Sequence, residues 1–266
     1  MSDIAAAFDA ARRDGRRAAL MPYLMGGFPD LEASRRIGIA GAEAGADLFE
    51  LGIPYSDPLA DGPVIHEAGT RALAAGATTA GVLDVGADLA ELVPVVVMCY
   101  ANLVYARGVD RFAADLAERG ISGLIVPDLP LEEGPDFLAA CDAHGVDLVP
   151  LVAPTTPDDR LALIGARARG FVYTVSVTGI TGERAGLAST ARDVLTRVRA
   201  HASVPVALGF GIASAADAAA AADAGADGVI VGSRLVRAAA EAAADGQDPA
   251  RAVARLVGEL SAGLSG

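Results

Sequence analysis

The stretch FELGIPYSDPLADGP, from Phe49 to Pro63, joins an apolar run to a loop rich in turn-forming residues. The run is typical of a buried strand, although it contains the carboxylate of Glu50. The loop that follows carries two further carboxylates, Asp57 and Asp61. In sheets built from parallel strands, catalytic groups gather where strands end and loops begin. This junction is therefore the first place to look for a site.

Eight apolar runs of this kind are spread along the 266 residues, at 19–25, 47–53, 94–100, 123–129, 147–153, 171–177, 205–211 and 228–233. Continuous apolar runs indicate parallel strands that are covered on both faces. Alanine-rich stretches of helical composition lie between them, and glycine ends several of these, as at 43–47, 118–123, 142–147 and 223–228.

This alternation predicts an α/β fold, a (β/α)₈ TIM barrel, as a single domain over residues 1–266. An extra N-terminal helix and a short phosphate-binding helix after the eighth strand are expected to accompany it. A doubly wound open sheet is the alternative, but eight evenly spaced units favour closure.

The composition excludes several classes of function. A net charge of −13 argues against a nucleic-acid surface, which needs a basic stripe. All 21 basic residues are arginine, so no Schiff-base lysine is available. The three histidines are too scattered to predict a metal site. Without an apolar run of membrane length or a signal peptide, we expect a cytoplasmic protein.

Strand alternation places Glu50 on the face opposite Phe49 and Leu51, and therefore in the barrel interior near its mouth. A buried carboxyl group either pairs with an arginine or has a raised pKa suited to acid–base catalysis. Because no arginine lies in a predicted strand, catalysis is favoured. Asp61 is either an ordinary turn residue or a second carboxylate of the same site. Tyr173 is either core or a neighbour of Glu50.

The last three predicted strands end in glycine-containing segments at 178–186, 209–212 and 231–234. Glycines allow backbone N–H groups to approach an anion closely, and the segment that begins at Gly232 and Ser233 opens a helix whose N-terminus favours negative charge. Barrels often bind phosphate at this position. A phosphorylated small molecule is the expected ligand.

Six segments in order resemble the tryptophan synthase alpha chain family: FELGIPYSDPLADGP, CYANLVYARGVDRF, LIVPDLPLEE, VYTVSVTGITG, ALGFGI and GVIVGS. The likeness covers nearly the whole chain. It implies cleavage of indole-3-glycerol phosphate to indole and glyceraldehyde 3-phosphate, a carbon–carbon lyase reaction without a Schiff base or a metal. It also implies that indole passes to a beta subunit, in an alpha2-beta2 complex. Pyridoxal phosphate is expected only in that partner, and no cofactor in this chain.

The resemblance assigns roles to particular residues. It implies catalysis by Glu50 and Asp61; substrate binding by Tyr173, Tyr23, Phe210 and Thr181; phosphate binding by Gly182, Gly211, Gly232 and Ser233; and contact with the partner by Asp57, Pro58, Asn102, Asp128 and Pro130. One departure is Val177, which stands where better-known members have arginine in a loop that closes over the substrate.

Three other hypotheses remain. The first is a sugar isomerase that uses two aspartates, such as Asp30 and Asp158. The second is a regulatory subunit that binds phosphate without catalysis. The third is a lyase that acts alone and releases free indole.

Overall fold

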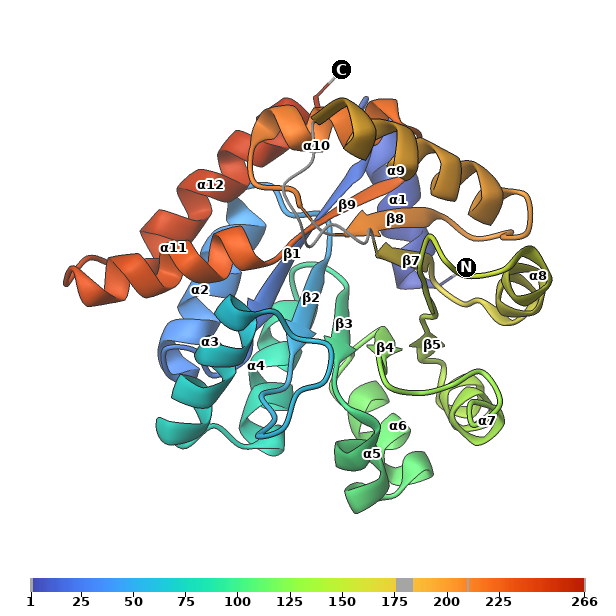
Figure 1. Ribbon diagram of the computed structural model, residues 1–266. Helices are drawn as coiled ribbons and strands as arrows, with labels where there is room; N and C mark the ends of the chain where they lie inside the picture. The colour runs from blue at the N-terminus through green and yellow to red at the C-terminus, as the bar shows by residue number, and fades with distance from the viewer. Residues whose placement is uncertain (1, 176–183, 210, 266) are drawn as a thin grey trace.

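The computed structural model describes residues 2–175, 184–209 and 211–265. In this part of the chain, helices surround one parallel sheet, which Figure 1 shows looking into the ring of strands. The strands are β1 (Ala19–Met25), β2 (Phe49–Gly52), β3 (Val95–Met98), β4 (Gly123–Ile125), β5 (Asp147–Leu148), β6 (Leu151–Val152), β7 (Val172–Val175), β8 (Val206–Gly209) and β9 (Gly228–Val231). Each predicted apolar run contains a strand.

In chain order, α1 precedes the first strand, and most strands are followed by one or two helices. They are α1 (Asp3–Arg13), α2 (Leu31–Glu43), α3 (Pro63–Ala74), α4 (Thr79–Ala90), α5 (Ala101–Arg107), α6 (Val109–Ala117), α7 (Pro135–His144), α8 (Asp158–Arg167), α9 (Arg184–Arg199), α10 (Ala215–Asp223), α11 (Ser233–Ala244) and α12 (Pro249–Gly263). The expected N-terminal helix is α1. The helix expected after the last strand is α11, and it extends over 12 residues.

The sheet closes on itself. Its strand order is β5-β4-β3-β2-β1-β9-β8-β7-β6, so the two ends are β5 and β6, which only Val149 and Pro150 separate in sequence. The Val149 N–H donates to the Leu124 carbonyl oxygen at 2.9 Å, and the Pro150 carbonyl oxygen accepts from the Tyr173 N–H at 2.9 Å. Since proline has no N–H of its own, it interrupts the fifth strand without opening the ring. Eight sequence units therefore form one barrel, as predicted.

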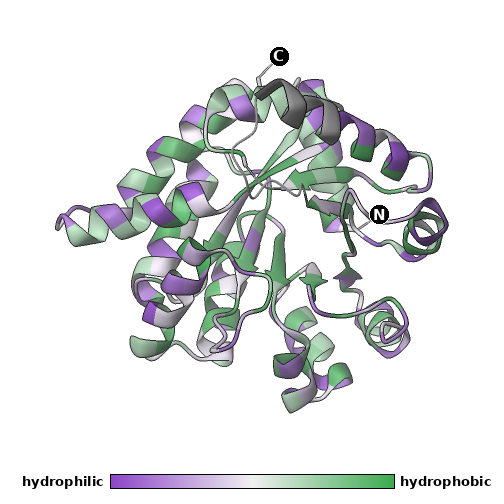
Figure 2. Cartoon of the chain, viewed as in Figure 1, coloured by the Kyte–Doolittle hydropathy of each residue, from purple (hydrophilic) through white to green (hydrophobic). Residues whose placement is uncertain are grey.

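Alternate residues along β2 and β3 face two different apolar regions. The barrel interior contains Leu48 and Val96, together with Phe8 of α1, which covers the amino-terminal end of the strands. The layer between strands and helices contains Phe49 and Leu51. Figure 2 shows largely hydrophobic strands and helices on which hydrophilic residues alternate with hydrophobic ones. This division confirms that Glu50 belongs to the interior face.

Local sequence signals fix the ends of the helices. Asp30 accepts a hydrogen bond from the Ala33 N–H at 2.8 Å and so caps α2, and Thr78 and Ser214 cap α4 and α10 in the same way. The glycines that the sequence places before strands have positive φ values, namely Gly45, Gly120, Gly145 and Gly225. Glycine adopts this conformation without the steric cost that a side chain imposes. Among the described residues, no helix is long and apolar enough to cross a membrane.

Candidate active site

Glu50 lies in the middle of β2 with its side chain inside the barrel. Parallel pairing places it beside Tyr23 of β1 and Val96 of β3. It is fully buried, and neither of its carboxyl oxygens has a hydrogen-bond partner among the described residues. The arginine partner that would have explained Glu50 as a structural residue is therefore absent from this part of the chain. The Tyr173 hydroxyl does not satisfy the carboxyl group either.

Burial raises the pKa of Glu50 to about 8, and the nearby negative charge of Asp61 contributes to the increase. A carboxyl group with this pKa is largely protonated at neutral pH, yet it exchanges its proton readily. The unsatisfied oxygens point to a role for which a reacting molecule supplies the missing partner.

Asp61 lies in the loop between β2 and α3, and a hydrogen bond from the neighbouring strand holds it. The Tyr100 hydroxyl donates to Asp61 Oδ1 at 3.0 Å and accepts from the Ala60 N–H at 2.9 Å. Burial raises the pKa of Asp61 above its ordinary value, and the Tyr100 hydrogen bond and the charge of the exposed His66 reduce this increase without cancelling it. The sequence analysis missed this role of Tyr100. The adjacency of β2 and β3 was the available signal, because Tyr100 lies two residues after the end of β3.

Two tyrosines lie inside the barrel opposite glycines. A Cβ atom on Gly52 would collide with the Tyr23 hydroxyl, and a Cβ on Gly209 would lie 2.5 Å from the Tyr173 hydroxyl. Burial raises the pKa of both tyrosines well above the ordinary value; the charges of Asp61 and Glu50 add to the increase for Tyr23, and the charge of Glu50 adds to it for Tyr173. Tyr23 and Tyr173 therefore both lie near Glu50.

Of the glycines expected to bind phosphate, the structure describes Gly211 and Gly232. Both lie near the end of the barrel that carries the other site residues. Gly232 precedes α11, whose N-terminus has no side-chain cap among the described residues, and a Cβ on Gly232 would lie 3.5 Å from Tyr23. Gly211 has a φ of 75°. Ser233 is exposed at the first position of α11. Thr181, Gly182 and Phe210, together with Val177, lie outside the described residues.

The residues expected at the partner interface come from the loop after β2, the first turn of α5 and the loop after β4, and hydrogen bonds join α5 to both loops. Asn102 Nδ2 donates to the Tyr55 hydroxyl at 3.2 Å, and Asp128 Oδ1 accepts from the Ala101 N–H at 2.9 Å. The Tyr55 and Tyr100 rings lie 5.3 Å apart, centroid to centroid. The side chains of this rim are Asp57, Pro58, Asn102, Asp128 and Pro130, of which all but the half-buried Pro58 are exposed. Tyr100 thus connects the rim to Asp61.

The aspartates of the sugar-isomerase hypothesis have structural partners instead. Asp30 caps α2, and Asp158 forms an ion pair with Arg197 at 2.7 Å. Within the described ranges, no three His, Cys, Asp or Glu side chains lie together as a group that could hold a metal ion.

A closed parallel barrel with paired carboxyl groups at the carboxyl ends of its strands is the arrangement of a (β/α)₈-barrel enzyme. The family model described as "Tryptophan synthase alpha chain" matches residues 8–265. The tryptophan synthase alpha chain of Prochlorococcus marinus (strain MIT 9313) is 48% identical over 242 residues, which cover 90% of this chain and 88% of that protein. That of Methanosarcina mazei is 45% identical over 252 residues, covering 95% and 91%.

Solved structures agree with these relatives. A structure of Mycobacterium tuberculosis tryptophan synthase superimposes with a TM-score of 0.90 at 42% identity, covering 99% of this chain and 98% of that one. Tryptophan synthase subunit alpha from Legionella pneumophila gives a TM-score of 0.91 at 32% identity, covering 99% and 98%. The chain belongs to the tryptophan synthase alpha chain family. It is accordingly a lyase of tryptophan biosynthesis.

Proposed function

We propose that Glu50 and Asp61 together perform the retro-aldol cleavage of indole-3-glycerol phosphate to indole and glyceraldehyde 3-phosphate. The observation that carries this proposal is the fully buried carboxyl group of Glu50, which has no hydrogen-bond partner in the described structure and has Asp61 nearby. The chain contains no lysine, so the cleavage proceeds without a Schiff base. It also proceeds without a metal, since carboxyl groups supply the acid and the base.

Glu50 takes part in two successive proton transfers. As a carboxylic acid it protonates the indole carbon that bears the glycerol chain, and the ring becomes positively charged. As a carboxylate it then removes the proton of the adjacent hydroxyl group. The carbon–carbon bond breaks as the aldehyde forms, and its electron pair returns to the ring. A pKa of about 8 suits both steps near neutral pH.

Asp61 complements the charge that develops on the ring. Its carboxylate accepts a hydrogen bond from the indole N–H and stabilises the protonated intermediate. The hydrogen bond from Tyr100 supports this role because it favours the ionised form of Asp61. Two carboxyl groups in different surroundings thereby take different parts in one reaction.

The remaining site residues bind the substrate. Tyr23 and Tyr173 lie near Glu50, and we assign them, together with Phe210 and Thr181, to the pocket that holds the indole and glycerol parts of the substrate. The phosphate group binds to backbone N–H groups at the N-terminus of α11, at Gly232 and Ser233, and to the loops that contain Gly182 and Gly211. The uncapped start of α11 supports this assignment because a helix N-terminus attracts anions.

We also propose that the single barrel domain, residues 1–266, works in the cytoplasm with a beta subunit, in an alpha2-beta2 complex. Indole passes directly to pyridoxal phosphate held by that partner, while this chain itself carries no cofactor. The continuous rim around Asp57, Asn102 and Asp128 supports a partner surface next to Asp61.

The test is indole release from indole-3-glycerol phosphate by wild type and Glu50→Gln, each with and without a beta subunit. Glu67→Gln, which changes an exposed glutamate of α3, is the matched control. We expect release by wild type and by the control, acceleration by the partner, and no measurable release by Glu50→Gln.

Release that Glu50→Gln leaves unchanged would assign the proton transfer to another group, with Asp61→Asn as the next variant. A wild type that releases no indole under any condition would overturn the proposal and favour a regulatory subunit. Release that the partner leaves unaffected would favour a lyase that acts alone.

A further inference from the structure

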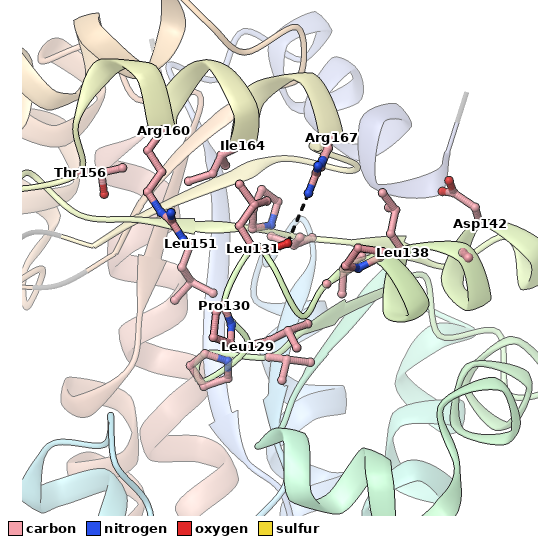
Figure 3. Close-up of a pocket in the computed structure, with 18 residues that line it drawn as sticks. Leu129, Pro130, Leu131, Leu138, Asp142, Leu151, Thr156, Arg160, Ile164 and Arg167 are labelled. Atoms are coloured by element: carbon pink, nitrogen blue, oxygen red, sulfur yellow. Dashed lines mark hydrogen bonds between the residues drawn. The ribbon is translucent and has the colours of Figure 1, made fainter.

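A cavity lies on the outer wall of the barrel, between α7 and α8 (Figure 3). Its volume is about 560 Å³, within the range of about 300–1,000 Å³ that is usual for small-molecule sites. Glu50, Asp61 and Tyr173 do not line it, so it is separate from the proposed active site, although Pro130 of the partner-facing rim belongs to its lining.

The cavity exists because α7 and α8, although they are neighbours around the barrel, make few side-chain contacts with each other. α7 packs mainly against α6, and α8 packs against α9. The α7 side of the cavity has small residues at Gly134 and Ala139. Behind it lies the fifth strand, which Pro150 divides into the two short segments β5 and β6. A thin strand between two separated helices leaves space that side chains do not fill.

The floor is apolar, whereas the edge carries Arg160 and Arg167 together with Asp142, whose carboxylate pairs with Arg169. Leu129, Leu138, Leu148, Leu151 and Ile164 are among the apolar residues that line the cavity. Arg160, Ile164 and Arg167 follow each other at spacings of four and three residues, so they share one face of α8. Figure 3 shows Arg160 and Arg167 extending from this face toward the segment around Leu131.

The two arginines differ in their partners. Arg160 forms a bidentate pair with Glu132, with both N···O distances at 2.8 Å, and this pair holds the pKa of Glu132 down to about 2. Arg167 donates from Nη1 to the Leu131 carbonyl oxygen at 3.2 Å. No carboxylate among the described residues lies within ion-pair distance of Arg167. Its guanidinium therefore keeps further N–H donors at the edge of the cavity, and its charge also helps to lower the pKa of Glu132.

We propose that this cavity binds a small amphipathic anion, with a flat aromatic or short aliphatic body on the leucine floor and an anionic head on Arg167. A guanidinium group presents paired N–H donors that match the oxygens of carboxylate, sulfonate and phosphate groups. The apolar floor supplies affinity for the body of the ligand, and Arg167 makes the cavity prefer an anionic head. The chain as a whole has a net charge of −13 and therefore repels anions. The positive charge of Arg167 attracts them locally.

The experiment is a fluorescence titration of the full chain with two probes. One is 1-anilinonaphthalene-8-sulfonate, and the other is N-phenyl-1-naphthylamine, which has the same rings without the sulfonate. Ala139→Trp fills the cavity from α7, and its control is Leu163→Trp on the exposed face of α8. Arg167→Gln removes the charge, and its control is Arg251→Gln on α12. Thermal unfolding of each variant establishes that it is folded.

We expect Ala139→Trp to weaken the binding of both probes and Leu163→Trp to leave binding unchanged. Arg167→Gln should weaken the binding of the sulfonate probe by about tenfold, which corresponds to the loss of one charge-assisted hydrogen bond. The affinity for the uncharged probe should not change. Binding that survives Ala139→Trp would overturn the proposed site. An equal effect of Arg167→Gln on both probes, or no effect on either, would overturn the proposed selectivity for anions.

Discussion

The Tyr100 hydroxyl donates a hydrogen bond to Asp61 Oδ1 at 3.0 Å and so connects the residue that follows β3 to the loop that follows β2. The same hydroxyl accepts from the Ala60 N–H at 2.9 Å, so the loop is held at two successive residues. The position of Asp61 therefore depends on a side chain from the next strand of the barrel.

Replacing Tyr100 by phenylalanine should lower kcat/KM for indole release by about tenfold, since a hydrogen bond to a charged group contributes about 1.5–3 kcal/mol. The Tyr100 hydrogen bond lowers the pKa of Asp61, so its loss should raise that pKa. The acidic limb of the pH–rate profile should consequently move to higher pH. Steady-state kinetics between pH 5 and 9 measure both effects.

The control for this variant is Tyr105→Phe, which changes a half-exposed tyrosine of α5 whose ring packs edge-on against Phe137. It should leave the pH–rate profile unchanged. A profile for Tyr100→Phe that coincides with wild type would contradict the positioning role of the hydroxyl.

Glu50 should make stability depend on pH. Its pKa rises from 4.5 to about 8 on folding, so between these values the folded chain keeps a proton that the unfolded chain has released. Glu50 therefore contributes most to stability below pH 4.5, and the contribution declines as pH rises to about 8, by at most about 1.4 kcal/mol per pH unit. Glu50→Gln lacks this dependence.

Urea unfolding of wild type and Glu50→Gln at pH 5, 6.5 and 8 measures the effect. The free energy of unfolding of the variant, relative to wild type, should increase with pH. The exposed control Glu67→Gln should show a constant difference. A constant difference for Glu50→Gln as well would mean that its pKa is not raised.

Gly52 makes room for the Tyr23 ring, so Gly52→Ala should destabilise the fold by about 1–3 kcal/mol and lower the rate of cleavage. The nearest ring carbon of Tyr23 would lie 2.7 Å from the new Cβ, and the tyrosine would have to move away from Glu50. Denaturant unfolding and indole release test this expectation.

Gly258→Ala provides a comparison of opposite sign. Gly258 lies within α12, and the nearest atom to an added Cβ is the Ala44 carbonyl oxygen at 4.0 Å. Alanine should stabilise this helix by up to about 1 kcal/mol. If Gly52→Ala were equally stabilising, the assigned contact with Tyr23 would be wrong.

Leu59 is 84% exposed in the loop between Pro58 and Asp61, where an apolar side chain gains from being covered. Leu59→Ser should weaken binding to the beta subunit by of the order of 1 kcal/mol. Titration calorimetry against the beta subunit measures the change. Leu92→Ser is the control, because Leu92 is 51% exposed and lies just before β3, at the opposite end of the strands. Equal affinities for the two variants would place the partner elsewhere.

The barrel itself could be predicted because its signals are local. Each strand is a run of apolar residues, and each of the glycines at 45, 120, 145 and 225 ends a helix with a positive φ. The interior position of Glu50 follows from the two-residue period of a strand. The division of the fifth strand was missed, although Pro150 within the run at 147–153 was a visible signal.

The sequence by itself determined the number of β/α units, the direction of Glu50 and the chemistry available without lysine. Only the tertiary structure decided that Glu50 has no partner among the described residues, that Tyr100 holds Asp61, and that a cavity separates α7 from α8. Strand and helix periods act over a few neighbouring residues and can be read along the chain. Contacts such as that between Tyr100 and Asp61 depend on the register between separate strands, which closure of the whole barrel sets.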